Sequence, residues 1–109
     1  MSATPENLFD AVPVGLPDEE ILELAAGPGT RIERIVSCGH VSPPGFWYEQ
    51  ERPEWVVLLQ GEAVLDFADG RSVRLRPGDY LTIAAQARHR VAWTSSDPPS
   101  VWLAVHYSG

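Results

Sequence analysis

Apolar and β-branched residues recur along most of this chain in short runs that are broken by turn residues. From Thr30 onward the runs are too short for helices, and several alternate with a period of two, as strands with one buried face do. Asp69-Gly70, between two such runs, is a strong hairpin signal. The pattern predicts strands at residues 30–37, 46–50, 54–60, 62–68, 71–76, 80–84, 88–94 and 100–107.

The run 54–60, EWVVLLQ, is apolar on both of its faces. Side chains of a strand alternate between two faces, so Glu54, Val56 and Leu58 share one face. The other face carries Trp55, Val57 and Leu59. A strand that is apolar on both sides needs a cover on each. We expect the second face to form a homodimer interface or to lie under the N-terminal segment.

The run 88–94 places a histidine among apolar residues. His89, Val91 and Trp93 share one face, and Arg88 and Arg90 point the other way. We therefore expect His89 and Trp93 to point inward. In 100–107 both faces are largely apolar, so the pattern does not orient His106.

The first 29 residues have a different character. Residues 1–17 hold three prolines and are predicted to form an irregular arm. Residues 18–26, DEEILELAA, fit a short helix capped by Asp18 and fit a strand equally well. Gly27-Pro28-Gly29 then breaks the chain. We expect an arm over 1–29 and an all-β sandwich or barrel over 30–109.

Composition narrows the function classes. The 109 residues are enough for one domain, and the 15 acidic and 8 basic residues give a net charge of −7. This charge disfavours nucleic acids and anionic membrane surfaces. Cys38 is the only cysteine, which rules out an internal disulfide and a thiolate metal cluster. No signal-peptide pattern or spanning apolar segment is present, so we expect a cytoplasmic protein without membrane contact.

EWVVLLQGEAVLDFADG, RLRPGDYLTI and ARHRV together resemble the small single-domain cupins over roughly residues 30–107. The resemblance implies a jelly-roll β-barrel, a homodimer, and a site inside the barrel that often holds a divalent metal. Glu54 and Gly61 match the glutamate and closing glycine of the first cupin motif, and His89 matches the histidine of the second. Tyr48 and Gln50 occupy the two histidine positions of the first motif; with a longer spacing these positions fall on Trp47 and Glu49.

The resemblance implies a site with the ligand set Tyr48, Gln50, Glu54 and His89. Iron, manganese, nickel or zinc are the candidate ions, for a metal-dependent dioxygenase or isomerase. The alternative is a metal-free barrel in which the same residues bind a small organic molecule without catalysis. Aromatic side chains favour a ring or sugar face as ligand, so Tyr48, Trp93 and Trp47 are the predicted substrate-binding residues.

Overall fold

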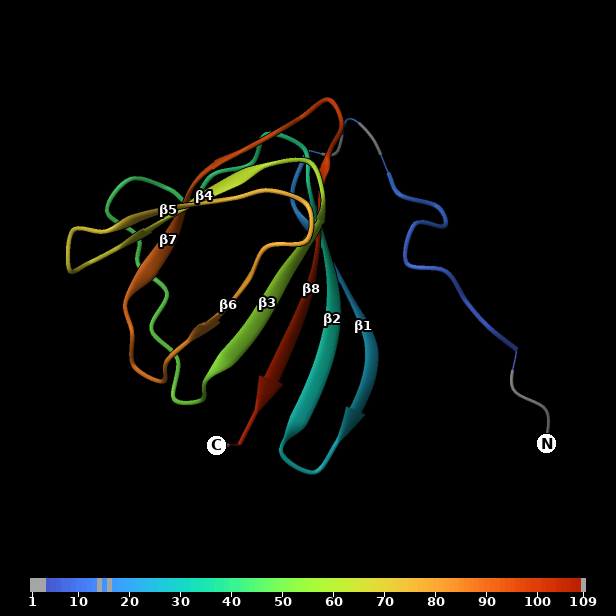
Figure 1. Ribbon diagram of the computed structural model, residues 1–109, viewed down its shortest axis with the longest axis horizontal. Helices are drawn as coiled ribbons and strands as arrows, with labels where there is room; N and C mark the ends of the chain where they lie inside the picture. The colour runs from blue at the N-terminus through green and yellow to red at the C-terminus, as the bar shows by residue number, and fades with distance from the viewer. Residues whose placement is uncertain (1–3, 14, 16, 109) are drawn as a thin grey trace.

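The computed structural model describes residues 4–13, 15 and 17–108, and its regular structure is entirely β (Figure 1). The strands are β1 (Glu20–Gly27), β2 (Thr30–Ser37), β3 (Glu54–Gln60), β4 (Ala63–Phe67), β5 (Ser72–Leu75), β6 (Tyr80–Ile83), β7 (His89–Thr94) and β8 (Ser100–Tyr107). The predicted all-β class is confirmed. Within the described ranges there is no helix long and apolar enough to cross a membrane.

The strands form two antiparallel sheets. A five-stranded sheet has the order β1-β2-β8-β3-β6, and a three-stranded sheet has the order β5-β4-β7. In Figure 1 the two sheets approach each other at one end and diverge at the other. They are not joined into a closed barrel over the part of the chain that the structure describes. The predicted barrel is thus realised as a two-sheet jelly roll that is open at one end.

For two segments, residues 18–26 and 46–50, only the tertiary structure shows whether a strand forms. Residues 18–26 adopt the strand alternative, because β1 finds a hairpin partner in β2, from Glu20 opposite Val36 to Gly27 opposite Thr30. Residues 46–50 form only an isolated bridge, in which Tyr48 exchanges backbone hydrogen bonds of 2.7 and 3.0 Å with His89. The Gln50 carbonyl accepts from the turn amide of Gln86 at 2.7 Å, so no continuous ladder forms here.

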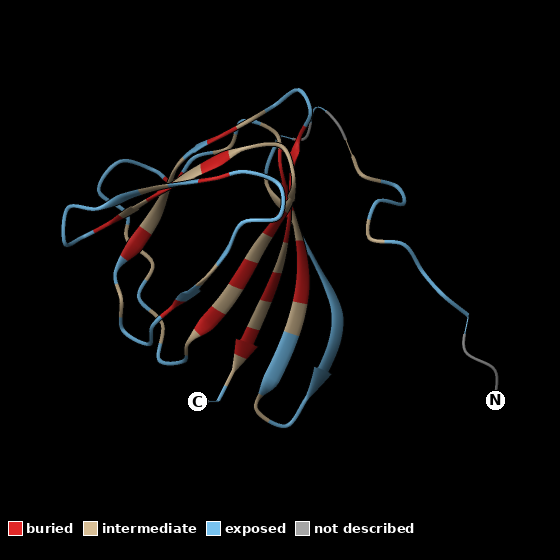
Figure 2. Cartoon of the chain, in the orientation of Figure 1, coloured by how far each residue is buried: buried red, intermediate tan, exposed pale blue. Residues whose placement is uncertain are grey.

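The core lies between the sheets. Figure 2 shows buried and half-buried positions alternating along β3, with β1 exposed. The predicted parity of β3 is confirmed, because Glu54, Val56 and Leu58 are buried while Trp55 and Val57 are half-buried. Complete burial of Leu58 contributes roughly 2 kcal/mol through removal of apolar surface from water. The core cluster comprises Val56, Leu58, Ala63, Leu65, Phe67, Leu75, Ile83, Trp102 and Ala104.

The N-terminal arm is anchored on the outside of the larger sheet. The Arg34 guanidinium on β2 donates to the carbonyls of Leu8 (3.2 Å) and Asp10 (2.8 Å). Figure 1 shows the described part of the arm on the β1 side of the sheet, away from β3. The outer face of β3 is covered in part by Tyr80, whose ring centroid lies 5.6 Å from that of Trp55. The homodimer expected on this face stays a prediction.

Candidate functional site

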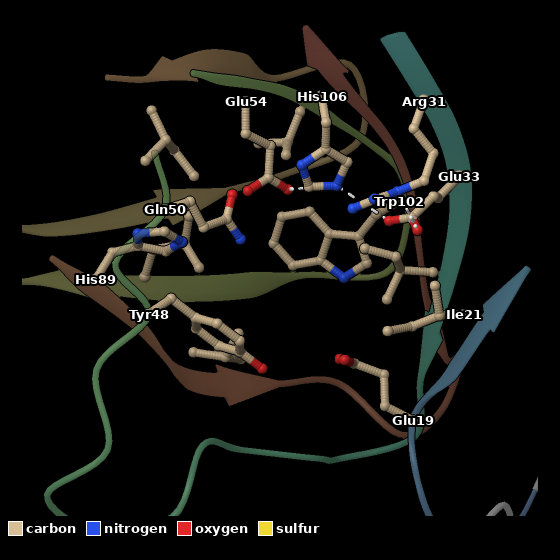
Figure 3. A pocket seen from close by; sticks show the side chains of 15 residues that line it. Glu19, Ile21, Arg31, Glu33, Tyr48, Gln50, Glu54, His89, Trp102 and His106 are labelled. Carbon is tan, nitrogen blue, oxygen red and sulfur yellow. Dashed lines mark hydrogen bonds and ion pairs between the residues drawn. The ribbon is translucent and has the colours of Figure 1, made fainter. Parts of the chain in front are cut away.

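A cavity of about 210 Å³ opens between the two sheets (Figure 3). Its wall is apolar where it meets the core, and polar side chains gather on one side and at the mouth. The lining residues are Glu19, Ile21, Arg31, Glu33, Ile35, Tyr48, Gln50, Glu54, Val56, Leu65, Ile83, His89, Val91, Trp102 and His106. Its volume is below the roughly 300–1,000 Å³ of pockets for drug-sized molecules, so it suits a small metabolite.

Strand register brings the polar residues of the larger sheet to one point. Glu54 on β3 lies directly opposite His106 on β8, and His106 lies opposite Arg31 on β2. Residues opposite each other in a ladder point to the same face. Glu33 is two residues from Arg31 and shares that face. This register orients His106 inward, which the sequence pattern left open.

His106 connects two carboxyl groups inside the cavity. Its Nε2 lies 3.0 Å from Glu33 Oε1 and 3.9 Å from Glu54 Oε2. An ionised carboxylate only accepts hydrogen bonds, so Nε2 donates to Glu33. The other Glu33 oxygen lies 2.9 Å from Arg31 Nε, and the Arg31 side chain is half exposed. These contacts form a chain from the solvent to Glu54.

Glu54 is a buried carboxyl group that points into the cavity. The residue is 7% exposed, and no side chain in the described ranges hydrogen-bonds to its carboxylate. Burial raises the pKa of Glu54 above its ordinary 4.5, and the Glu33 charge also raises it, while His106, His89 and Arg31 act in the opposite direction. The carboxyl group is therefore a stronger base than one in water.

His89 faces the cavity from the other sheet. Its inward orientation is confirmed, because the residue is 5% exposed and lines the cavity. Nδ1 lies 3.0 Å from the Ala87 carbonyl, which can only accept. In the neutral imidazole Nδ1 is therefore the protonated nitrogen, and Nε2 keeps a free lone pair.

Tyr48 and Gln50 line the cavity beside His89. The Tyr48 ring stacks on the His89 ring with centroids 5.5 Å apart. Burial raises the pKa of Tyr48 above its ordinary 10.0; the charges of Glu19 and Glu54 raise it further, and a hydrogen bond with Ser42 lowers it. The phenol thus stays protonated and can donate to a ligand.

The two predicted tryptophans lie outside the cavity. The prediction that Trp93 points inward is wrong, because Trp93 is 43% exposed. A β-bulge explains this result: Val64 pairs with Trp93 but Leu65 pairs with Val91, so one residue of β7 is skipped and the parity reverses. Trp47 also does not line the cavity; it lies beside Arg88, whose guanidinium carbon is 5.8 Å from its ring.

The sequence pattern did not select five residues that line the cavity: Glu19, Arg31, Glu33, Trp102 and His106. A signal was available for Glu33, since this charged residue interrupts the β-branched run 30–37 at a position that becomes buried. The others depend on which strand lies next to which. Period-two alternation predicts faces within one strand but says nothing about neighbours.

The donor set does not fit the three-histidine, one-glutamate site that the resemblance implies. No group of three His, Cys, Asp or Glu side chains able to hold an ion occurs in the described part of the chain. Glu54 and the free Nε2 of His89 are the two strong donors, and Tyr48 and Gln50 are weak ones. His106 Nε2 is engaged by Glu33. The four-residue ligand set remains a prediction.

The model of the cupin domain family matches residues 36–106. This chain is a cupin. The match contains all of β3 to β7, and thus both Glu54 and His89.

Solved structures agree with the family assignment. A crystal structure from Ralstonia eutropha, of a protein named "putative mannose-6-phosphate isomerase", is 47% identical, has a TM-score of 0.93 and covers 98% of this chain and 100% of its own. A cupin superfamily protein from Desulfitobacterium hafniense shares the fold at 20% identity, with a TM-score of 0.80 and coverage of 100% and 94%. The cupin domain of Schizosaccharomyces pombe Cnp3 matches at 11% identity, with a TM-score of 0.73 and coverage of 88% and 65%. No curated protein matches this chain.

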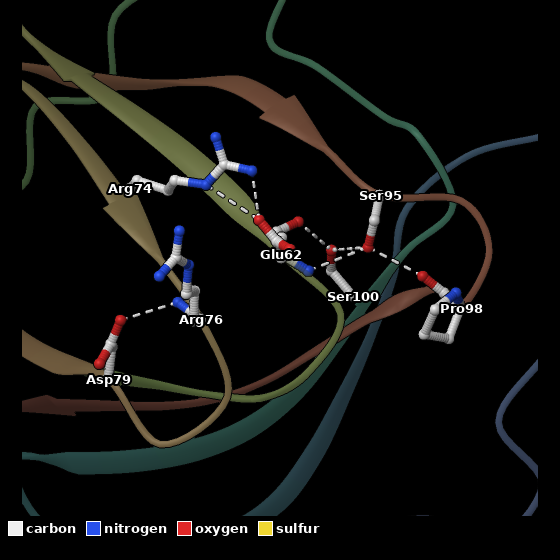
Figure 4. Close-up of polar contacts among 7 residues, drawn as sticks. All are labelled: Glu62, Arg74, Arg76, Asp79, Ser95, Pro98 and Ser100. Atoms are coloured by element: carbon white, nitrogen blue, oxygen red, sulfur yellow. Dashed lines mark hydrogen bonds and ion pairs between the residues drawn. The ribbon is translucent and has the colours of Figure 1, made fainter.

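Two turns, at Gly61 and at Gln86, are crowded or strained. Gly61, the closing glycine of the first motif, has φ 81°, and a Cβ there would lie 2.5 Å from Ser95 Oγ and 2.9 Å from the Pro99 carbonyl. Figure 4 shows the adjacent network, in which Ser95 Oγ accepts from the Glu62 amide (3.0 Å) and donates to the Pro98 carbonyl (2.8 Å). Gln86 has φ 68°, a conformation that favours glycine.

Proposed function

We propose that this cupin binds a small organic molecule in its cavity and isomerises it by proton transfer, with Glu54 as the base. The observation that carries the proposal is the Glu54 carboxyl group, buried, facing the cavity and without a hydrogen-bond partner in the described structure. A base whose pKa is raised toward neutral pH removes a proton from carbon more effectively than an ordinary carboxylate does.

Two groups on opposite sheets support a proton shuttle. Glu54 lies on β3 of the larger sheet, and His89 lies on β7 of the smaller one. A ligand between them has a carboxylate on one side and the free Nε2 of His89 on the other. The Glu54 carboxylate can take a proton from one carbon of the ligand and, as the carboxylic acid, return it to the neighbouring carbon. His89 Nε2 can take the proton of a ligand hydroxyl and return it to the adjacent oxygen.

His106 acts as a positioning residue. Its 3.9 Å separation from Glu54 exceeds hydrogen-bond length, so it influences Glu54 through its charge and not by direct proton transfer. The hydrogen bond to Glu33 and the Arg31–Glu33 ion pair hold the imidazole in place.

The relative from Ralstonia eutropha supports the reaction class. The protein that is 47% identical carries the name of an isomerase. Interconversion of an aldose and a ketose moves a proton between neighbouring carbons, which is the chemistry that Glu54 and His89 offer. The name of this relative supports the type of reaction only. The class of substrate depends on the charge of the cavity.

Solvent exchange tests the proposal without a known substrate. The protein is incubated in D₂O with a panel of small aldoses, hydroxy acids and amino acids, and loss of C–H signals is followed by NMR. We expect exchange for at least one class, with Glu54→Gln slower by about 100-fold or more. Trp93→Phe, outside the cavity, is the matched control. Absence of exchange across the panel, or full exchange by Glu54→Gln, contradicts the proposal.

A metal-assisted version of this function uses Glu54, His89, Gln50 and Tyr48 as ligands. Elemental analysis of untagged protein, before and after incubation with iron, manganese, nickel or zinc, tests it. One tightly held ion per chain that is lost in His89→Ala supports this version. Occupancy far below one ion per chain under all conditions contradicts it and leaves the metal-free cavity.

The second candidate function is ligand binding without catalysis. The replacement of both first-motif histidines by Tyr48 and Gln50, which are good hydrogen-bonding groups and weak metal ligands, favours it. A molecule that binds without exchanging its protons would support this function.

The cytoplasmic location of the protein stays a prediction.

A further inference from the structure

The cavity has an unbalanced charge. Three carboxyl groups line it, those of Glu19, Glu33 and Glu54, against the single guanidinium of Arg31. Arg31 Nε is paired with Glu33 at 2.9 Å, so most of its charge is compensated within the protein. Among the residues described, Glu19 is therefore the cavity carboxyl group without a basic side chain at ion-pair distance, and Glu54 has only the His106 imidazole, 3.9 Å away.

Among the residues described, the other basic side chains of the cavity are the imidazoles of His89 and His106, and His106 is already held by Glu33. The chain has eight arginines and no lysine. Of the described arginines only Arg31 lines the cavity. Others are engaged elsewhere, with the partners Glu20 for Arg34, Asp69 for Arg71, Glu62 for Arg74, Glu49 for Arg88 and the Ser42 carbonyl for Arg90. The described structure also lacks a helix whose N-terminus could hold a phosphate.

Two buried groups show independently that the cavity is shaped for a polar ligand. Glu54 is 7% exposed and His89 is 5% exposed, and both face the cavity. The Glu54 carboxylate and the His89 Nε2 have no hydrogen-bond partner in the part of the protein that is described. Both groups are open to the cavity, so a ligand with complementary polar atoms can contact them there.

The mouth of the cavity combines a carboxylate with aromatic surfaces. Glu19 is half-buried, and its Oε2 accepts a 2.7 Å hydrogen bond from Ser37 Oγ, which fixes its direction. In Figure 3 the Tyr48 hydroxyl and the Glu19 carboxylate point toward each other across the mouth, with the Trp102 ring above them. A carboxylate beside a phenol hydroxyl and an indole ring is an environment that attracts ammonium groups.

We propose that the ligand of this cavity is a small amine, held by its ammonium group between Glu19 and the rings of Tyr48 and Trp102. The proposal shares the cavity with the proposed function and names its substrate class. A phosphate ester adds about two negative charges at neutral pH and would face three carboxyl groups, with the one guanidinium already paired to Glu33. We therefore expect sugar phosphates to bind poorly, in contrast to the substrate that the name of the relative suggests.

Three hexoses that share one ring and differ in charge test the proposal. Isothermal titration calorimetry compares mannosamine, mannose and mannose 6-phosphate, with choline as a smaller cation. We expect mannosamine to bind roughly tenfold more tightly than mannose, the effect of one charge-assisted hydrogen bond, and mannose 6-phosphate not to bind. Choline, which has no N–H to donate, measures the attraction of the cation to the carboxylate and the aromatic rings alone. Added salt should weaken this preference.

The variant Glu19→Gln tests how much the negative charge of Glu19 contributes to cation binding. It should remove most of the preference for mannosamine or choline, and Glu51→Gln, an exposed carboxyl group outside the cavity, should leave the preference unchanged. Binding of mannose 6-phosphate as tight as that of mannosamine, or failure of both cations to bind, overturns the proposal. Cation binding without deuterium exchange supports the charge preference and contradicts the isomerase, so the two failures are distinguishable.

Discussion

The imidazole of His106 and the carboxylate of Glu33 form a buried pair, with Nε2 and Oε1 3.0 Å apart. The two residues are 73 positions apart in the chain and meet because β2 and β8 are neighbours in the larger sheet. This pair separates Glu33 from Glu54, so it allows two carboxyl groups to share one small cavity.

Removal of the imidazole should leave these carboxyl groups in direct repulsion. We expect His106→Leu to lower the free energy of unfolding by about 1–3 kcal/mol, because Glu33 loses its buried partner. Adding Glu33→Gln to this variant should recover part of the loss. Urea unfolding of wild type, both single variants and the double variant gives the coupling energy. If the stability losses of the two single variants add up to that of the double variant, the His106–Glu33 pair contributes nothing to stability.

Glu54→Gln should change the dependence of stability on pH. The pKa of Glu54 is raised in the folded state, so the folded protein holds this proton more tightly than the unfolded chain does. Its stabilising contribution is complete below the ordinary pKa of 4.5 and is lost as pH rises through the folded value. Relative to wild type, Glu54→Gln should therefore gain stability toward neutral pH, by about 1 kcal/mol or more. Unfolding curves measured from about pH 4 to about pH 8 test this, because that range runs from the ordinary carboxyl pKa to beyond neutral pH.

An unchanged difference between the two proteins across this pH range would contradict the raised pKa. Glu51→Gln, an exposed carboxyl group, is the control and should show no comparable trend.

Gly61→Ala should be among the more destabilising small substitutions. The new Cβ would meet Ser95 Oγ at 2.5 Å and the Pro99 carbonyl at 2.9 Å, at a φ of 81°. We expect a loss of about 2 kcal/mol or more. Gly70→Ala is the matched control, since its φ of 99° is equally unfavourable but nothing lies within 4 Å. Equal losses of thermal stability in Gly61→Ala and Gly70→Ala would contradict this prediction, because they would show that the neighbours of Gly61 move aside for the new Cβ.

Substitutions at Gln86 should report its backbone conformation. Gln86→Val should cost about 1–2 kcal/mol, because a β-branched residue tolerates a φ of 68° poorly. Gln86→Gly should be neutral or stabilising by a few tenths of a kcal/mol. Ala85→Val, next in the same exposed turn, is the control and should be milder. Chemical denaturation that gives equal losses at both positions would contradict the strained turn.

The expected homodimer can be tested by sizing. If the outer face of β3 is the interface, Trp55→Glu should convert the dimer into a monomer, since a buried charge there has no partner. Leu24→Glu on β1, where apolar side chains are exposed, is the comparison. Light scattering should show a monomer for Trp55→Glu only. A dimer retained in Trp55→Glu but lost in Leu24→Glu would assign the interface to β1.

Period-two alternation, turn residues and motif spacing predicted much of this protein. They gave the β3 face with Glu54, the inward His89, the Asp69-Gly70 hairpin and the positions of Tyr48 and Gln50 in the cupin pattern. These features depend on residues close together in the chain, where side-chain direction follows from the backbone period alone.

Only the tertiary structure decided the rest. The bulge in β7 moved Trp93 outward, because one skipped residue reverses every later side chain. Pairing of β2, β8 and β3 brought Arg31, Glu33 and His106 to Glu54. The sequence by itself therefore determined most of the strands and the inward positions of Glu54 and His89. The charge of the cavity follows from which strands lie side by side, because that choice is made by the packing of the whole core and not by any local pattern.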